Sequence, residues 1–171
     1  MAQNRGKQFE QVIQKAFLKI PEVSIDRLHD QTTGYAGSSN ICDFVVYKKP
    51  YEYYIECKSV HGNTLSIYGN DPKHKYGNIS NKQWEGLTEK SSIEGVGAGV
   101  ICWWVDKGVT AFIPIAELSI ARREGYKSIR FNHEPFLKYG FIELKGEKKR
   151  VFFDYDMDSF FHAMQKQERR H

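Results

Sequence analysis

The chain has 171 residues, of which 40% are hydrophobic, 27% charged and 14% aromatic, and its formal net charge is +4. This length and composition predict one soluble globular domain over residues 1–171. No apolar run approaches the ~18 residues that cross a bilayer, which excludes a membrane-spanning protein. Residues 1–10 hold no apolar segment of the signal-peptide kind, so we expect a cytoplasmic protein with no membrane partner. The mild positive charge is compatible with a polyanionic partner without demanding one.

Residues 4–20 predict an amphipathic helix, because their apolar side chains recur at helical spacing. Pro21 ends this helix, since proline lacks the backbone N–H that a helix interior needs. Glu10 falls at the edge of the apolar stripe. Its carboxylate either looks toward a neighbouring sheet or is a solvated residue on the flank, and the helix alone leaves both interpretations open.

Residues 23–28 alternate weakly and predict a first strand. Residues 29–40 follow as a loop rich in Gly, Ser and Thr, with Arg27 and His29 at its border. Side chains of Ser, Thr and Asn, and backbone N–H groups near Gly, can bond phosphate oxygens. The loop is therefore a predicted ligand-contact segment.

Residues 43–59, DFVVYKKPYEYYIECKS, contain two apolar, aromatic-rich runs separated by a polar break at Lys48, Lys49 and Pro50. Such runs predict two strands joined by a turn. Side chains alternate along a strand, so Glu56 and Lys58 share one face, roughly 6.6 Å apart along the chain.

The turn also predicts a partner for Glu56. If the hairpin is centred between Lys49 and Pro50, Asp43 lies directly opposite Glu56, and opposed side chains have Cβ atoms roughly 4.5–5.5 Å apart. Two carboxylates this close repel each other unless a proton or a cation lies between them, and a hard divalent ion prefers such oxygen ligands. The alternative for Glu56 and Lys58 is a surface ion pair worth about 0–1 kcal/mol.

The cysteines Cys42, Cys57 and Cys102 are an odd set without the spacing of a zinc site, and we expect buried free thiols. The register that pairs Asp43 with Glu56 also pairs Cys42 with Cys57 on the opposite face. We therefore expect that face to be the core side.

Residues 65–67 predict a short strand, and residues 69–77 a loop in which Lys73 and Lys75 lie among tyrosines. Basic residues interleaved with aromatic residues suit nucleic acid, which offers both charge and stacking. An ordinary solvated loop is an equal alternative.

A capping box from Ser80 to Gln83 predicts the start of a second helix, which Gly95, Gly97 and Gly99 are expected to end. Further elements follow from apolar patterning and turn residues: a buried strand over 98–105, a strand over 109–113 and a helix over 115–123. The last part predicts a hairpin of strands 139–144 and 150–155 around residues 145–148, and a helix from the cap Asp156 to Glu168. We treat residues 139–168 as an extension of the domain.

The order helix with Glu, strand, Asp at a hairpin start, then E-x-K-S resembles the PD-(D/E)XK nuclease superfamily. Here the pattern is D43-x12-E56-x-K58, with Cys42 where the superfamily name has Pro. More narrowly, the chain resembles the RecU Holliday-junction resolvases of Gram-positive bacteria and their phages. The supporting stretches are NRGKQFE at 4–10, DFVVYKKPYEYYIECKS at 43–59, SNKQWEGL at 80–87 and GVGAGVICWW at 95–104, with GYKSI at 125–129 and VFFDYDMDSFF at 151–161.

The resemblance implies an α/β fold of the restriction-endonuclease-like kind, a mixed β-sheet flanked by helices. It also implies a homodimer, which would make two symmetric nicks, and Mg²⁺-dependent cleavage of four-way DNA junctions, with Mn²⁺ as an alternative ion. Asp43, Glu56, Lys58 and Glu10 are then the catalytic residues. The expected metal ligands are Asp43, Glu56, Glu10 and the backbone carbonyl of Cys57.

The resemblance places Arg5 and Gln83 near DNA, and the polar loop and basic segments add further contacts. The residues expected to bind DNA are Arg5, Lys7, Arg27, Ser39, Asn40, Ser59, Lys73, Lys75, Lys82 and Gln83. RecU proteins carry a stalk before the catalytic Asp that engages the junction, whereas here only residues 21–42 separate the first helix from Asp43. The stalk is therefore reduced or missing.

Two alternatives remain at this stage. One is another nuclease of the superfamily, of the restriction or repair type, acting on duplex DNA. The other is a non-catalytic module that binds branched DNA. The expected setting is the cytoplasm of a bacterium or of a phage-infected host.

Overall fold

A six-stranded mixed sheet forms the centre of the protein in a computed structural model that describes residues 4–29, 40–131 and 140–169. The strand order is β1-β2-β3-β5-β6-β8, and β3 runs parallel to β5 while the other neighbours are antiparallel. The strands are β1 Ser24–Arg27, β2 Phe44–Lys48, β3 Tyr51–Val60, β5 Val96–Trp104, β6 Val109–Pro114 and β8 Ile142–Glu143.

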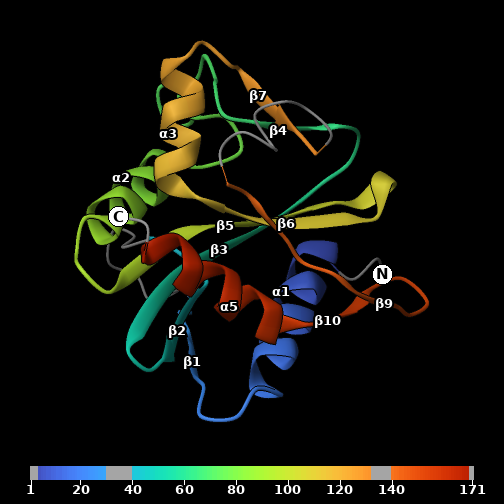
Figure 1. Cartoon of the computed structure of the whole chain (residues 1–171). Helices are drawn as coiled ribbons and strands as arrows, with labels where there is room; N and C mark the ends of the chain where they lie inside the picture. Colours follow the sequence, from blue (N-terminus) through green and yellow to red (C-terminus); the bar gives the residue numbers. More distant parts are fainter. Residues whose placement is uncertain (1–3, 30–39, 132–139, 170–171) are drawn as a thin grey trace.

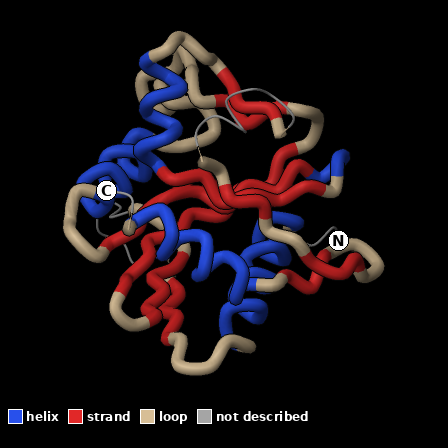
Figure 2. Tube along the Cα trace, in the orientation of Figure 1, coloured by secondary structure: helices blue, strands red, loops and turns tan. Residues whose placement is uncertain are grey.

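Helices cover both faces of this sheet (Figures 1 and 2). On one face, α1 (Arg5–Leu18) and α5 (Met157–Glu168) enclose one apolar core, and on the other, α2 (Asn81–Ser91) and α3 (Ile115–Arg123) enclose a second. The sequence prediction of a mixed α/β sheet flanked by helices is thus confirmed. Among the described residues, no helix is both long and apolar enough to span a membrane.

The remaining elements are short. Two small antiparallel sheets pair β4 (Thr64–Ser66) with β7 (Ser128–Arg130), and β9 (Gly146–Lys148) with β10 (Phe153–Tyr155). A 3₁₀ helix, η1 (Val105–Lys107), joins β5 to β6. In Figure 1 the β4–β7 sheet lies above the central sheet, on the side of α3, and the β9–β10 sheet lies below it, beside α1.

The first helix forms largely as its apolar pattern predicts. The side chain of Asn4 caps it by accepting the N–H of Gly6, and Phe9, Ile13 and Phe17 are buried beneath it. Its end at Leu18 comes just before Pro21. The ring of Phe17 packs against those of Phe160 and Phe161 in α5, so the inner side of this helix belongs to the apolar core.

The hairpin of β2 and β3 has the register predicted from its turn. Phe44 pairs with Ile55 and Lys48 with Tyr51, and continuing this ladder by one residue places Asp43 opposite Glu56. Asp43 is the last residue on the β2 side whose backbone bonds β3, since its N–H donates to the carbonyl of Ile55 at 3.1 Å. The hairpin therefore delivers both carboxylates to one end of the sheet.

The predicted pairing of Cys42 with Cys57 is wrong. Cys57 is in the core under α1 and α5, whereas Cys42 is in the core on the α2 side. The reason is that the β2 ladder begins at Phe44, so residue 42 no longer follows the alternation of the strand. Both faces of β3 are core faces. All three cysteines are buried free thiols, as predicted.

Two of the three glycines expected to end the second helix belong instead to β5. The helix stops at Ser91, and Gly97 and Gly99 lie within the strand. A Cβ atom at Gly99 would come within 2.3 Å of the carbonyl oxygen of Ile113, so glycine lets β6 approach closely here. The capping box itself is confirmed, with both reciprocal hydrogen bonds between Ser80 and Gln83.

The predicted hairpin around residues 145–148 is also wrong. β8 pairs with β6 in the main sheet, and β9 begins only after it, at Gly146, to pair with β10. The turn therefore lies at residues 149–152, where the N–H of Lys149 donates to the carbonyl of Phe152. The final helix is confirmed, with Asp156 as its cap and Phe160, Phe161 and Met164 buried.

Candidate active site

A cavity of about 450 Å³ opens where α1, the end of β1 and the start of α2 meet the β2–β3 hairpin. Its lining is mostly polar. The lining residues are Lys7, Glu10, Arg27, Leu28, His29, Asn40, Cys42, Asp43, Glu56 and Gln83.

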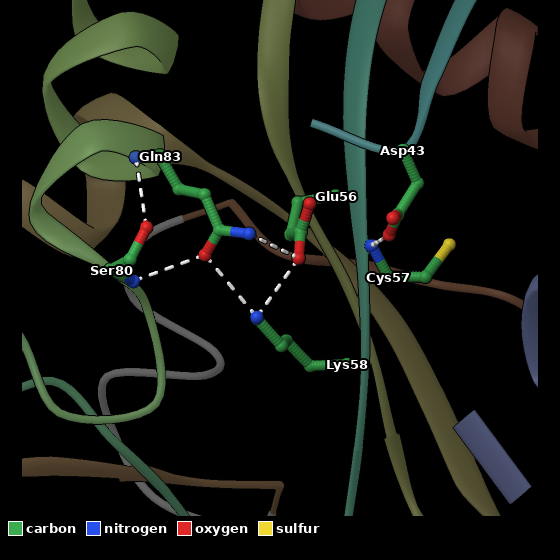
Figure 3. A network of polar contacts seen from close by, with 6 residues as sticks. All are labelled: Asp43, Glu56, Cys57, Lys58, Ser80 and Gln83. Atoms are coloured by element: carbon green, nitrogen blue, oxygen red, sulfur yellow. Dashed lines mark hydrogen bonds and ion pairs between the residues drawn. The ribbon is translucent and has the colours of Figure 1, made fainter. Parts of the chain in front are cut away.

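Asp43 is fixed by the backbone of the neighbouring strand. Its Oδ2 accepts the N–H of Cys57 at 2.8 Å, a bond that takes the place of the next ladder contact (Figure 3). The N–H and C=O of one residue point to the same edge of a strand. The carbonyl of Cys57 therefore faces the side on which Asp43 lies, as its predicted role as an oxygen ligand requires.

Glu56 is almost fully enclosed, with 4% of its surface exposed. Its Oε1 receives Lys58 Nζ at 2.9 Å and Gln83 Nε2 at 2.7 Å. Its other oxygen, Oε2, is buried and has no hydrogen-bond partner among the described residues. Such an oxygen is costly to bury without a partner, so it marks a place for a proton or a cation.

Gln83 joins the helix cap to the charged pair (Figure 3). Its Oε1 accepts the N–H of Ser80 at 3.0 Å and Lys58 Nζ at 3.3 Å, while its Nε2 donates to Glu56. The sequence identified Gln83 as a cap and as a DNA contact, but not as the residue that holds Lys58 and Glu56 together. The same capping box was the available signal, since it fixes the side chain at the start of α2.

Burial raises the pKa of all three carboxylates that line the cavity. For Glu56 burial outweighs the opposing effect of Lys58 and, with Asp43 nearby, raises the pKa to about 8. Burial raises the pKa of Asp43 and of Glu10 as well, and the charge of Asp43 adds to the rise at Glu10. In the absence of a bound cation, Glu56 therefore holds a proton near neutral pH.

Glu10 lines the same cavity but is held in an ion pair. Its Oε2 receives Arg27 Nη2 at 2.5 Å, and both side chains are partly buried. The structure thus brings together Asp43, Glu56 and Lys58, and places Glu10 at the rim in contact with Arg27. Sequence reasoning did not foresee this pair, because it joins a helix to a strand edge.

The donor set fits a hard divalent cation, although no group of three or more His, Cys, Asp or Glu side chains in the described part of the chain is arranged to hold a metal ion. Mg²⁺ keeps several water ligands and needs only one or two protein carboxylates together with a substrate phosphate. Asp43 and Glu56 supply that number, and the unpartnered Oε2 of Glu56 is an oxygen without a competing donor.

The residues predicted to contact DNA fall into several groups. Lys7, Arg27, Asn40 and Gln83 line the cavity. Lys82 is exposed in the first turn of α2. Ser59 does not line the cavity, because its side chain lies on the other face of β3 from that of Lys58. Ser39 lies outside the described residues.

The loop of residues 69–77 presents a stack of aromatic rings and cations. Tyr76 stacks on Trp84 at 4.5 Å between centroids, and Lys75 Nζ and the guanidinium of Arg122 lie 4.8 and 4.5 Å from the Tyr76 ring. Lys73 is exposed nearby in the same loop. Arg122 was missed because α3 joins this loop only in the folded protein.

Arg5 lies apart from the cavity, at the start of α1. Its Nη1 is 3.1 Å from His61 Nε2, and His61 Nδ1 is in turn 3.2 Å from Asp106. Arg5 is exposed and is therefore available to a ligand.

The chain matches no family model and no curated protein. Among solved structures it is similar to Hjc, a Holliday junction resolvase from the archaeal hyperthermophile Archaeoglobus fulgidus. The TM-score is 0.45 and the identity 18%, over 66% of this chain and 78% of that chain. At this level of similarity, function is inferred from the residues of this chain alone.

Proposed function

We propose that this protein is a metal-dependent endodeoxyribonuclease that hydrolyses phosphodiester bonds of four-way DNA junctions. One observation supports it above the others: a buried Glu56 with an unpartnered oxygen lies beside Asp43 and in contact with Lys58 at a polar cavity. A surface ion pair, the alternative for Glu56 and Lys58, does not account for a carboxylate that is 4% exposed.

Asp43 and Glu56 would hold a Mg²⁺ ion, with the Cys57 carbonyl and Glu10 as further oxygen ligands. When bound, the ion would polarise a phosphoryl oxygen and lower the pKa of a water ligand. For Glu10 to join, its carboxylate has to leave Arg27, which would then be free to contact a phosphate.

Lys58 supplies positive charge where the phosphorane-like transition state builds negative charge. Its ammonium lies 2.9 Å from Glu56 and 3.3 Å from Gln83, so the capped end of α2 fixes its position before any substrate arrives. Held in advance, the ammonium needs little reorganisation during the reaction.

The preference for four-way junctions is supported by the RecU-like motifs in the sequence. Two symmetric nicks in a junction require two active sites related by a two-fold axis, so we propose that the working form is a homodimer. A second candidate, a nuclease acting on plain duplex, is favoured by one observation: only residues 19–42 separate α1 from Asp43, and β1 occupies part of that segment.

Cleavage of a synthetic four-way junction beside a linear duplex of the same sequence, with and without Mg²⁺, tests the proposal. We expect paired symmetric nicks in the junction and slow cleavage of the duplex. Equal cutting of both substrates would contradict the resolvase proposal and support a nuclease that acts on plain duplex. Binding of the junction without cleavage in Mg²⁺ or Mn²⁺ would instead identify a non-catalytic binding module.

A further inference from the structure

The β9–β10 hairpin has a basic tip. Lys148 ends β9, and Lys149 and Arg150 form the turn, followed by Val151, whose surface is 52% exposed. The hairpin projects from the body of the protein beside α1 (Figure 1). None of its residues belongs to the cavity described above.

The tip stands between two hollows that share Arg5 and Val151. One, of about 550 Å³, is lined by Arg5, Gln8, Lys149, Arg150, Val151 and Phe152. The other, of about 260 Å³, includes Arg5, Lys107, Lys148 and Val151. Both hollows therefore collect positive charge from the hairpin and from α1, and the smaller one also from Lys107 in η1.

Little negative charge offsets this surface. Asp106 is the one acid among the described residues lining the two hollows, and it already bonds the N–H of Gly62 at 2.5 Å. Glu147 pairs with Lys149 at 3.0 Å. Within the described residues no ion pair holds Lys148 or Arg150. The surface therefore carries an excess of positive charge, which favours a polyanionic ligand.

The surface is continuous with the active site through α1. The first turns of this helix present Arg5 and Gln8 to the basic hollow and Lys7 and Glu10 to the catalytic cavity. A polyanion that lies in the cavity can thus extend past the helix to the hairpin. A two-stranded ribbon with cations and a small apolar residue at its tip also matches the width of a DNA groove.

We infer that Lys148, Lys149 and Arg150, together with Arg5 and Lys107, form a second DNA-binding surface that grips the backbone of the substrate on one side of the cleaved phosphate. This inference rests on the proposed function for its substrate, but it concerns affinity and not chemistry. The ligand class is the phosphate backbone of duplex DNA.

A charge-matched pair of variants tests it. The first is Lys148→Gln/Lys149→Gln/Arg150→Gln. The control is Lys49→Gln/Lys166→Gln/Arg169→Gln, which removes the same residue types at exposed positions in the β2–β3 turn and at the end of α5, on the other side of Figure 1. Binding of a labelled four-way junction and of a linear duplex is measured in Ca²⁺ over a range of salt concentrations.

We expect the hairpin variant to bind about tenfold or more weakly at low salt, and the control within about threefold of the parent. The slope of log affinity against log salt should fall by about 2–3, since each lost phosphate contact removes about 0.9. The rescue variant Lys148→Arg/Lys149→Arg/Arg150→Lys should bind DNA as tightly as the parent does. All variants should have the same melting temperature as the parent.

Equal loss in the hairpin and control variants would overturn the inference. The separate outcomes distinguish it from the proposed function. If the parent binds DNA through the hairpin but never cuts, the nuclease proposal fails and the surface stands. If the parent cuts and the hairpin variant binds as the control does, only the surface fails. A parent that binds no DNA overturns both.

Discussion

The two faces of β3 both pack against a core and yet do opposite things. One face places Tyr53, Ile55 and Cys57 in the apolar core beneath α1 and α5. The other places Glu56 and Lys58 beside the start of α2, where a single amide, Gln83, contacts both. The first face therefore stabilises the sheet, whereas the second buries charge at a cost in stability.

This difference shows how the site can be recognised without a bound ligand. A protein that needed only stability would fill the second face with apolar side chains, as it fills the first. Instead, burial raises the pKa of Glu56 to about 8, and one of its oxygens has no partner among the described residues. Perturbed carboxylates in a cavity are a recurrent sign of a functional site.

The largest effect is expected on the polar face, from Lys58→Met. Loss of the ammonium should slow junction cleavage by about 10³-fold, because the transition state loses a preorganised positive charge. Single-turnover cleavage in Mg²⁺ measures it. Lys90→Met is the matched control, since Lys90 Nζ lies 4.9 Å from the Tyr54 ring on the same face of β3, away from Glu56. A Lys58→Met protein that cuts at the parent's rate would remove this residue from the chemistry.

On the apolar face, Ile55→Ala should destabilise the fold by about 2–5 kcal/mol, because it leaves a cavity in a closed core. Urea unfolding followed by circular dichroism gives the free energy of unfolding. Ile93→Ala, at an exposed position, makes the same chemical change and should cost well under about 1 kcal/mol. Equal losses in both variants would mean that this face is not the structural one.

Glu56→Gln should stabilise the protein, and more so as the pH rises. The folded-state pKa of Glu56, about 8, lies above its ordinary value of 4.5, so its favourable contribution is complete below pH 4.5 and is lost as the pH approaches 8. The gain over the parent should therefore grow by roughly 3 kcal/mol between pH 5 and pH 8 in metal-free buffer. Glu94→Gln, at an exposed site, is the control. A gain that does not change with pH would contradict the buried, protonated carboxyl.

The smallest of these effects is expected from Gln83→Ala. It should lower the cleavage rate by about tenfold, since Lys58 and Glu56 lose their shared partner. Ser80→Ala separates this role from helix capping, because it breaks the cap at the Ser80 hydroxyl and leaves the contacts of Gln83 with the charged pair. We expect Ser80→Ala to lower the melting temperature while cutting within about threefold of the parent. Equal loss of cleavage in both would reduce Gln83 to a capping residue.

The features predicted from the sequence are those set by local geometry. The polar break before Tyr51 fixed the hairpin register, and with it the approach of Asp43 to Glu56. The capping box fixed the start of α2. The mixed sheet was instead expected from the family resemblance, and the strand order confirms it.

The features that sequence reasoning missed depend on how distant segments pack. The Glu10–Arg27 pair joins α1 to β1, and the stack of Arg122 on Tyr76 joins α3 to a loop. The side on which Cys42 lies, and the pairing of β9 with β10, also depend on where the main sheet ends. No periodicity in the sequence encodes these contacts.

The central claim is that Asp43 and Glu56 form a metal site for DNA cleavage. Its most direct test is a Mg²⁺ titration of junction cleavage by the parent and by Asp43→Asn, which keeps the size of the side chain and removes its charge. The proposal predicts no cleavage in EDTA, a rate that rises and saturates with Mg²⁺ in the parent, and at least about 10²-fold slower cleavage by Asp43→Asn. Full cleavage in EDTA would contradict it. So would an Asp43→Asn protein whose cleavage rate rises with Mg²⁺ concentration as that of the parent does.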